Sequence, residues 1–454
     1  MTGAFTRRAL RLGLAVATLA ALALILRVVL APWPDAEQAR LCRLTLPALS
    51  AEGARIEVER VMQATSTDAI RIDYRVNGVD HAVRCAFSGS ALDPSKSELV
   101  ALVKDGEPLS PIKLHLLRRY WLERPEVALP FDPGPGQGER PLVSLPDGVA
   151  YFAQQIANGL APTAVLSLLA AAYALIYGLV GRINLSFGDF AVVGAMSAVT
   201  GTVLATTLGS GALIPGVLFA GALAVATTVL HGLAAERVVF TRLAFGRGQT
   251  LLIATIALSI VLQEYMRIYA GAEMRWIPPI LGIPLPFAAD IGFTATMTVL
   301  QLLVTVLGGF LAIGLMVFLD LSDFGRRWRA VADDAAMAAL LGVSARRVMT
   351  QSFLIATLLA GFAGFITAMQ YGGASPSGGT VLGLKALAAA IVGGVGSVGG
   401  AMLGGVAIGL MQAVWVAYLP IEQADAAILL LLVAVLILRP GGLFGFAEEG
   451  PRPV

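Results

Sequence analysis

Residues 149–445 are almost continuously apolar and are broken only by short polar loops. Because about 20 apolar residues suffice to cross the hydrocarbon core as a helix, this pattern predicts a bundle of membrane helices. Several runs are shorter than a full span, which predicts broken or tilted helices. The predicted segments are 156–180, 188–207, 212–233, 250–269, 293–319, 349–370, 384–397, 399–419 and 426–438.

The start of the chain has a different pattern. Residues 1–33 hold one apolar stretch, 12–26, which follows three arginines within residues 7–11. This is the arrangement of a signal sequence, so the segment is either an uncleaved signal anchor or a removed signal peptide. In both cases the arginines keep the N-terminus cytoplasmic and place residues 34–148 outside the cytoplasm.

Residues 34–148 are polar and mixed, which indicates a small α+β or β-rich domain. Apolar side chains alternate with polar ones over residues 70–76 and 79–87, on both sides of Asn77-Gly78. Asn-Gly between alternating runs predicts a β-hairpin, because a type I′ turn needs two positive φ angles. Residues 110–121 are expected to form a helix.

Both cysteines of the chain, Cys42 and Cys85, lie in this polar segment. A disulfide between them suits an oxidising compartment, and the alternative is two buried free thiols. Further along the same polar segment, residues 131–137 have the Pro-Gly composition of a linker. The pattern thus divides the chain into a signal segment (1–33), an extracytoplasmic domain (34–148), a multi-helix membrane domain (149–445) and a cytoplasmic tail (446–454).

The composition supports a membrane protein. Of 454 residues, 57% are hydrophobic and 14% are charged, and the mean hydropathy is +0.78. Soluble domains are nearer half apolar and a quarter charged, so an ordinary soluble enzyme and a disordered chain are excluded. The net charge of +2 is too small to attract nucleic acid, and three histidines and two cysteines leave little material for a metal site.

The distribution of arginine predicts the orientation. If residue 149 lies outside, alternate loops fall on the cytoplasmic side, and these loops carry most of the arginines of the membrane domain. This orientation agrees with the arginines near the N-terminus and places the C-terminus in the cytoplasm. We expect the membrane to be the inner membrane of a bacterium. The arginines predicted to lie inside are Arg182, Arg237, Arg242, Arg247, Arg326, Arg327, Arg329, Arg346, Arg347 and Arg439.

The long loop 320–348 is predicted to be cytoplasmic. Residues 331–341 are expected to form a short helix that Gly342 ends as a C′ glycine. Arginines such as Arg326 and Arg329 surround this helix. It is therefore either a docking element for a cytoplasmic partner or a basic loop held by anionic lipid.

Several motifs together resemble the branched-chain amino acid permease family of ABC importers. Three departures stand out: Phe187 replaces a histidine that many members carry, the Glu-Ala-Ala form of the loop is kept only as Ala338-Ala339, and residues 34–148 lie outside the family pattern. The matching motifs are GRRWRA (325–330), AALLGV (338–343), AYAL (172–175), GRINLSFGDF (181–190), Lys385-Ala386 before IVGGVGSVGG (391–400), and RPGGLFG (439–445).

The resemblance implies an all-α polytopic permease. Its partners would be a second permease subunit, two cytoplasmic ATPase subunits and an extracytoplasmic solute-binding protein. It implies leucine, isoleucine, valine or related amino acids as substrates, and in other members urea or short amides. The chain itself would bind no cofactor, because the partners use the ATP. The residues assigned to ATPase coupling are Gly325, Arg326, Arg329, Ala338, Ala339 and Gly342.

Two breaks interrupt the apolar pattern, at 181–189 and 391–400. Paired broken helices point to a site near the midplane, where helix N-termini receive an anionic group. The alternative is that both breaks are turns at the inner surface. Lys385 either attracts a substrate carboxylate or reaches lipid headgroups. The residues that this hypothesis places on the translocation pathway are Asn184, Ser186, Gly188, Asp189, Lys385, Gly396 and Ser397.

Glycines recur every four residues near the second break. Small residues at this spacing let two helices approach closely. We expect these glycines to pack within the domain or against a partner subunit. They are Gly396, Gly400 and Gly404, and Gly405 and Gly409.

The sequence lacks the motifs GxxxxGK[ST], HExxH and GxSxG, so the chain is expected not to be an enzyme and its energy must come from a separate ATPase or an ion gradient. The second hypothesis is an ion-coupled secondary transporter, which needs ionisable residues deep in the bundle. Beyond Asp189, Glu264, Arg267 and Lys385 such residues are few, and none is expected in the middle of a segment. Glu264 and Arg267 are expected to form a surface pair.

Overall fold

The computed structural model describes residues 36–51, 53–64, 69–89, 98–134, 136, 143–208, 213–243, 249–277, 284–289, 294–394 and 396–444. The predicted signal segment 1–33 and the predicted tail 446–454 lie outside these residues. The described residues form two compact units. The N-terminal unit contains those up to Gln154 together with those of 284–299, and the helical unit contains the others.

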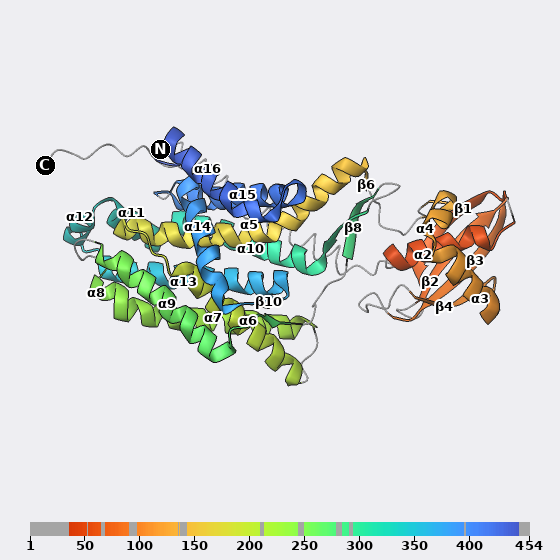
Figure 1. Ribbon diagram of the computed structural model, residues 1–454, viewed down its shortest axis with the longest axis horizontal. Coiled ribbons are helices and arrows are strands. Elements are labelled where there is room, and N and C mark those ends of the chain that lie inside the picture. Colours follow the sequence, from red (N-terminus) through yellow and green to blue (C-terminus); the bar gives the residue numbers. More distant parts are fainter. Residues whose placement is uncertain are drawn as a thin grey trace. The chain divides into compact units, whose positions relative to one another are not determined.

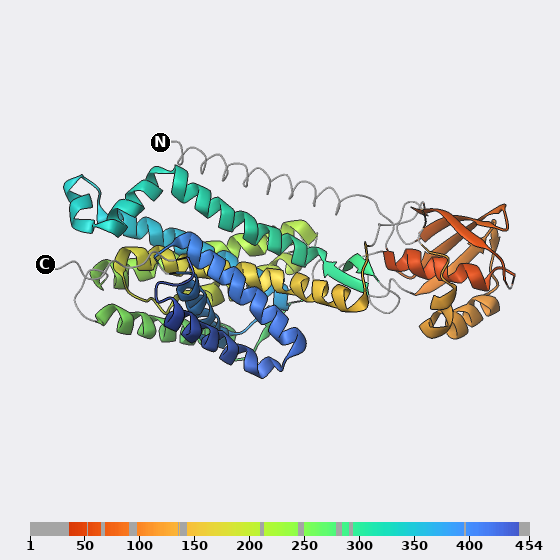
Figure 2. The same cartoon turned by 90° about the horizontal axis from the view of Figure 1, so that it is seen from above.

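A five-stranded antiparallel sheet forms the centre of the N-terminal unit, with its strands in chain order. The predicted hairpin is confirmed, because β2 and β3 pair through to Val76 and Val79, and φ is 49° at Asn77 and 86° at Gly78. Helix α2 (Ala36–Ala48) packs on one face of the sheet (Figure 2). The strands are β1 (Ile56–Gln63), β2 (Ala69–Val76), β3 (Val79–Phe87), β4 (Leu99–Lys104) and β5 (Glu107–Pro108).

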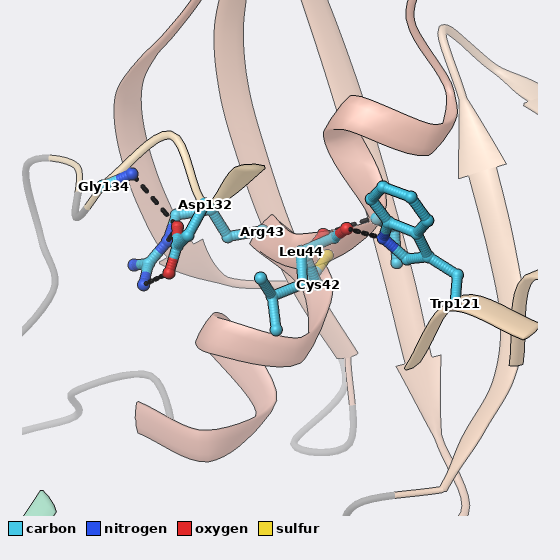
Figure 3. Close-up of polar contacts among 7 residues, drawn as sticks. Cys42, Arg43, Leu44, Trp121, Asp132 and Gly134 are labelled. Carbon is cyan, nitrogen blue, oxygen red and sulfur yellow. Dashed lines mark hydrogen bonds and ion pairs between the residues drawn. The ribbon is translucent and has the colours of Figure 1, made fainter. Parts of the chain in front are cut away.

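A disulfide and a hydrogen bond from Trp121 are among the long-range contacts that fix α2 to the rest of this unit, and Figure 3 draws the hydrogen bond. A disulfide joins Cys42 of α2 to Cys85 of β3, with 5.8 Å between their Cα atoms. The indole Nε1 of Trp121 donates to the carbonyl of Leu44 at 2.7 Å. Trp121 lies on the helix predicted over 110–121, which is present as α3 (Pro111–Leu117) continued by the π-helix η1 (Arg118–Leu122). Of the two alternatives for the cysteines, the structure contains the disulfide.

The segment predicted to be a linker is in fact tied to α2 at its start. Arg43 donates to both carboxylate oxygens of Asp132, at 2.6 and 2.9 Å, and Asp132 also accepts from the Gly134 N–H at 3.0 Å. Burial raises the pKa of Asp132, but these donors stabilise the carboxylate and hold the pKa below its usual value. The linker prediction is therefore wrong for residues 131–134, because Pro-Gly composition suits an anchored turn equally well.

A three-stranded sheet extends the N-terminal unit with residues from later in the chain. Strand β8 (Pro284–Ala289) pairs in parallel with β6 (Val143–Ser144) and antiparallel with β9 (Thr294–Thr298). The side-chain amide of Gln154 binds both main-chain groups of Thr296, at 2.6 and 2.5 Å. The predicted boundary at residue 149 is therefore incomplete, because pairing over so long a sequence separation leaves no mark on local composition. Short helices α4 (Pro125–Ala128) and η2 (Leu129–Phe131) also belong to this unit.

Within the described part of the chain, nine helices are long and apolar enough to cross a membrane. They correspond to the nine predicted segments, since an apolar chain can satisfy its backbone groups in lipid only by forming helices. The predicted segment 384–397 is shifted, since the helix begins at Gly379 and ends at Gly393. The nine helices are α5 (Asp147–Val180), α6 (Phe187–Thr207), α7 (Leu213–Ala235), α9 (Thr250–Ala270), α10 (Val299–Leu321), α13 (Ala345–Tyr371), α14 (Gly379–Gly393), α15 (Val398–Tyr418) and α16 (Ala424–Leu438).

Short elements connect these helices. Figure 1 shows α11 and α12 together at one end of the helical unit. Strands β7 and β10 pair where α9 and α13 end. The connecting elements are η3 (Glu236–Phe240), α8 (Thr241–Leu243), β7 (Arg275–Trp276), α11 (Asp323–Asp333), α12 (Ala335–Leu340), β10 (Gly373–Ala374), η4 (Pro376–Gly378) and η5 (Ile421–Gln423).

Glycines on α15 allow two neighbours to approach it closely. A Cβ at Gly404 would collide with the backbone of α14 near Gly393, and one at Gly405 would collide with α5 at Ser167. The predicted glycine packing is confirmed within the chain, with one correction. Gly396 precedes α15, and among the described residues, its chain neighbours aside, none has an atom within 4 Å of the position of a Cβ there, so it is not part of the packed face.

Candidate functional site

A buried carboxylate joins three helices of the helical unit. Asp189, in the first turn of α6, is 2% exposed. Its Oδ2 accepts from the hydroxyl of Ser259, and its Oδ1 accepts from Nε2 of Gln263 at 2.9 Å, both on α9. The same Nε2 lies 2.7 Å from Oγ1 of Thr380 on α14. The network therefore ties α6, α9 and α14 together.

Glycines bring α6 and α14 close enough for this network. A Cβ at Gly188 would collide with the carbonyl of Gly379 and the backbone of Gly383. This contact places Asp189 beside Gly379, the first residue of α14. The N-terminus of a helix carries partial positive charge, so it favours a carboxylate at this position.

The later residues of the first predicted break pack along α9. The Leu185 N–H donates to Oγ1 of Thr255 at 3.3 Å, and Asp189 contacts Ser259 and Gln263 further along the same helix face. Asn184 accepts from the N–H of Ser186 at 3.0 Å and from its hydroxyl at 2.7 Å. The break is a turn between α5 and α6 whose last residues pack along α9 (Thr250–Ala270) as far as Ser259, near the centre of that helix, and both alternatives for its depth in the membrane stay predictions.

For Asp189, the expectation that no ionisable residue lies in the middle of its own segment is confirmed. Asp189 begins its own helix, but its carboxylate is level with the centre of α9. Asp189 was among the predicted site residues, whereas Ser259 and Gln263 were not predicted. The signal was present, since two polar residues four apart in an apolar helix share one face.

The second predicted break lies at the other end of α14. Ser397 accepts from the Gly400 N–H at 3.1 Å and so caps α15. The carbonyl of Gly393 accepts from the Phe444 N–H at 3.0 Å, beyond the end of α16. Gly396 and Ser397 are thus not brought together with Asp189, Asn184 and Ser186, and the pathway role of both groups stays a prediction.

The remaining charged candidates form ion pairs. Lys385 Nζ lies 2.6 Å from Oδ1 of Asp425 at the start of α16, an arrangement that neither alternative for this lysine anticipated. Glu264 and Arg267 pair at 2.5 Å with both side chains at least half exposed, which confirms the predicted surface pair.

The predicted loop helix over 331–341 is wrong in one respect, because it is two helices. Asp334 is extended (φ −155°, ψ 105°) and separates α11 from α12. Its carboxylate accepts from the N–H groups of Ala336 and Met337, at 2.8 and 2.9 Å, so it caps α12. An Asp at an N-cap satisfies amides that a continuous helix would bond internally. Gly342 ends α12 with a φ of 83°, as predicted.

Helix α11 is anchored to the ends of two spanning helices. The Trp328 Nε1 donates to the Leu175 carbonyl of α5 at 3.1 Å. Arg329 Nη1 donates to the Leu319 carbonyl of α10 at 2.9 Å, and Gly325 packs against that same carbonyl. Gly325 is therefore buried, whereas the Arg329 side chain reaches back to α10 and is still 46% exposed. Arg326 pairs with Asp323 one turn earlier on α11.

Helix α12 has one buried face and one exposed face. Ala338 is 3% exposed, whereas Ala339 is exposed. Leu340 and Leu341 are 81% and 84% exposed, and Met337 is 60% exposed. Sequence analysis did not select these three side chains, because their spacing resembles that of any apolar helix face.

The model of the family described as branched-chain amino acid transport system / permease component matches residues 155–438. The chain belongs to this family. The match covers nearly the whole helical unit, and the resemblance found in the sequence is confirmed. The permease is thus a multi-pass membrane protein of a transport system.

Two relatives that match this chain over most of their own length support this assignment. The high-affinity branched-chain amino acid transport system permease protein LivH of Escherichia coli K12 is 31% identical over 300 residues, which are 66% of this permease and 97% of the relative. The corresponding protein BraD of Pseudomonas aeruginosa is 31% identical over 300 residues, 66% and 98% of the two chains. The N-terminal sheet of the permease precedes the matched region.

A more distant likeness concerns a shorter stretch. The xylose transport system permease protein XylH of Escherichia coli K12 is 36% identical over 100 residues, which are 21% of the permease and 25% of that relative. No solved structure was found to match the permease. Asp189, Ser259, Gln263 and the α11–α12 segment all lie inside the family match.

Proposed function

We propose that this chain is the membrane-spanning permease subunit of an ABC importer. Its substrates are branched-chain or related small amino acids, and separate ATPase subunits drive it. The family match and the names of the relatives support the substrate class. The chain performs no chemistry of its own, and its work is to open a pathway alternately to the two sides of the membrane.

The observation that carries this proposal is the apolar surface of α12. Leu340 and Leu341 are more than four-fifths exposed at one end of the bundle, next to an α11 that is firmly held (Figure 1). Exposed leucines at a rigidly held helix tip are costly in water and suit a pocket on a partner. In the proposed importer that partner is a cytoplasmic ATPase subunit.

The contacts of α11 explain how movement of this tip reaches the pathway. Trp328 binds the end of α5, while Gly325 and Arg329 bind the end of α10. When the ATPases close on ATP, a displaced α11–α12 segment therefore pulls on two spanning helices. Small displacements are passed on because packed interiors are stiff.

The orientation and the other partners follow from the same proposal. The α11–α12 segment and both termini are cytoplasmic, and residues 34–148 are extracytoplasmic, where the Cys42–Cys85 disulfide suits an oxidising compartment. A second permease subunit, two ATPase subunits and an extracytoplasmic solute-binding protein complete the importer. The lipid of a bacterial inner membrane surrounds the nine candidate spanning helices of the described residues.

An ion-coupled secondary transporter is a second candidate, and one observation favours it. Asp189 is a buried carboxylate at the middle of α9, where such transporters hold a proton or sodium ion. However, both carboxylate oxygens already accept hydrogen bonds, from Ser259 and Gln263, so the group is built as a helix tie. The family match also favours the importer.

Uptake by a strain lacking this chain tests the proposal. We expect the strain to lose uptake of labelled leucine, isoleucine and valine, and plasmid-borne full-length chain to restore it. Unlabelled valine should compete, whereas excess xylose or urea should not. Unchanged leucine uptake in the deletion strain, or restored uptake of urea alone, would contradict the proposal.

A further inference from the structure

A cavity of about 320 Å³ lies within the helical unit, bounded by α5, α6, α13, α14 and α15. Its walls are mostly aliphatic, with Val165 on α5, Val192 on α6 and Leu382 on α14. Pockets for small molecules begin near this size and combine apolar walls with a few well-placed polar groups. The lining excludes Asp189, so this cavity is separate from the network described above.

Gln370, near the end of α13, supplies an acceptor to this cavity. Its Oε1 is buried and has no hydrogen-bond partner among the residues that the structure describes. Buried polar groups in native proteins are nearly always paired, so an acceptor in a cavity wall with no protein partner is available to a donor inside the cavity. A ligand ammonium group is a donor of the required kind.

Lys385, on α14, supplies a cation to the same cavity. Its side chain is 19% exposed, and its Nζ is paired at 2.6 Å with Asp425, whose side chain is 57% exposed. Asp425 is not among the lining residues, so the lysine joins the cavity to a carboxylate outside it. A ligand carboxylate inside the cavity would compete with Asp425 for this ammonium.

We infer that this cavity binds a zwitterionic α-amino acid with a small aliphatic side chain. The substrate carboxylate binds Lys385, its ammonium donates to Oε1 of Gln370, and its side chain packs on the aliphatic wall. The inference rests on the proposed function and adds the site at which the permease itself holds its substrate. Asp425 is the internal competitor that occupies Lys385 when the cavity is empty.

Binding of labelled L-leucine to the purified full-length chain in lipid nanodiscs tests the inference. Two analogues separate the polar contacts, because leucinol lacks the carboxylate and 4-methyl-2-oxopentanoate lacks the ammonium. We expect Lys385→Met to weaken leucine binding about tenfold to a hundredfold, the range for a charge-assisted contact, and to leave leucinol binding nearly unchanged. Gln370→Leu should weaken the binding of leucine and leave the binding of 4-methyl-2-oxopentanoate nearly unchanged.

Asp425→Asn gives the decisive comparison. If Lys385 serves the ligand, this variant frees the lysine and leucine binds more tightly than to the unaltered chain. If the Lys385–Asp425 pair only holds α14 to α16, Lys385→Met and Asp425→Asn weaken leucine binding to the same degree. That result would overturn the inference. Lys113→Met is the matched control, because Lys113 is exposed on α3 of the N-terminal unit.

Uptake by complemented cells separates failure of this inference from failure of the proposed function. If the unaltered chain restores leucine uptake and Lys385→Met, Gln370→Leu and Asp425→Asn transport leucine with unaltered KM, the cavity is not the substrate site and the permease assignment stands. If the unaltered chain restores no leucine uptake, the proposed function itself fails. The inference would also be overturned if lipid or detergent occupied the cavity and thereby abolished leucine binding.

Discussion

Gln263 donates its side-chain amide to the carboxylate of Asp189 at 2.9 Å, across 74 positions of the chain. The same nitrogen lies 2.7 Å from the hydroxyl of Thr380. One amide therefore links the first turns of α6 and α14 to the middle of α9. In a bundle of apolar helices, such polar ties fix the register of segments that hydrophobic packing alone leaves free to slide.

Replacing Gln263 by leucine should loosen this junction. The variant keeps the volume but leaves Asp189 with the Ser259 hydroxyl alone, so we expect a loss of about 1.5–3 kcal/mol, the range for hydrogen bonds to charged groups. Thr380→Val removes only a neutral contact and should cost about 1 kcal/mol or less. Thermal unfolding in nanodiscs measures the loss of stability in both variants. An equal melting temperature for Gln263→Leu and the unaltered chain would contradict the role of the network.

The exposed leucines of α12 predict a separation of folding from coupling. Leu341→Asp changes a side chain that is 84% exposed, so the chain should fold and insert normally while leucine uptake is lost. Ala338→Asp places a charge at a position that is 3% exposed and should reduce the amount of folded protein instead. Size-exclusion profiles and uptake measured together distinguish the two. Full uptake by Leu341→Asp would show that α12 is not a docking surface.

Local signals in the sequence were sufficient for several elements. The hairpin was predictable because Asn77-Gly78 suits a turn that needs two positive φ angles. The apolar segments were predictable as helices because lipid offers the backbone no hydrogen-bond partner outside the helix itself. The division of the loop at Asp334 was missed because its alanines favour one continuous helix, whereas the carboxylate caps a new one.

Contacts between distant segments account for what the sequence did not predict. Lys385 pairs with Asp425, and Gln263 reaches Asp189, only because α14, α16, α6 and α9 pack together. Likewise, β8 joins β6 through a pairing that composition does not encode. Within the candidate site, the charged member was recognisable, and its neutral partners Ser259 and Gln263 were not.

The Arg43–Asp132 pair predicts acid sensitivity of the N-terminal unit. The pKa of Asp132 is lowered on folding, so its contribution to stability is complete above the unfolded value, about 4, and is lost as the pH falls through the folded value. Protection of α2 amides from hydrogen exchange, corrected for intrinsic rates, should therefore fall below about pH 4. Asp132→Asn should lower protection at neutral pH and flatten this dependence.

Asp80→Asn is the control for this pH experiment, because Asp80 pairs with Arg75 at the surface with a side chain that is 78% exposed. Such pairs contribute little, so the control should behave as the unaltered chain does. The account fails if Asp132→Asn and Asp80→Asn have the same effect on the protection of α2.

The Cys42–Cys85 disulfide predicts a covalent difference that mass spectrometry detects. Alkylation of the unfolded full-length chain should add no mass until a reductant is present, and two alkyl groups afterwards. Replacing both cysteines by alanine should destabilise the N-terminal unit by about 2–4 kcal/mol. Alkylation without reductant, in chain taken from the membrane of its host, would mean that the thiols are free there.

The energy source of uptake is the most direct test of the central claim that this chain is a conduit moved from its α11–α12 end by ATPase subunits. Leucine uptake should be measured in complemented cells under two opposite conditions, ATP depleted with the proton gradient kept, and the gradient collapsed with ATP kept. The account predicts that uptake stops in the first condition and continues in the second. Uptake that continues when ATP is depleted and stops when the gradient is collapsed would contradict the account.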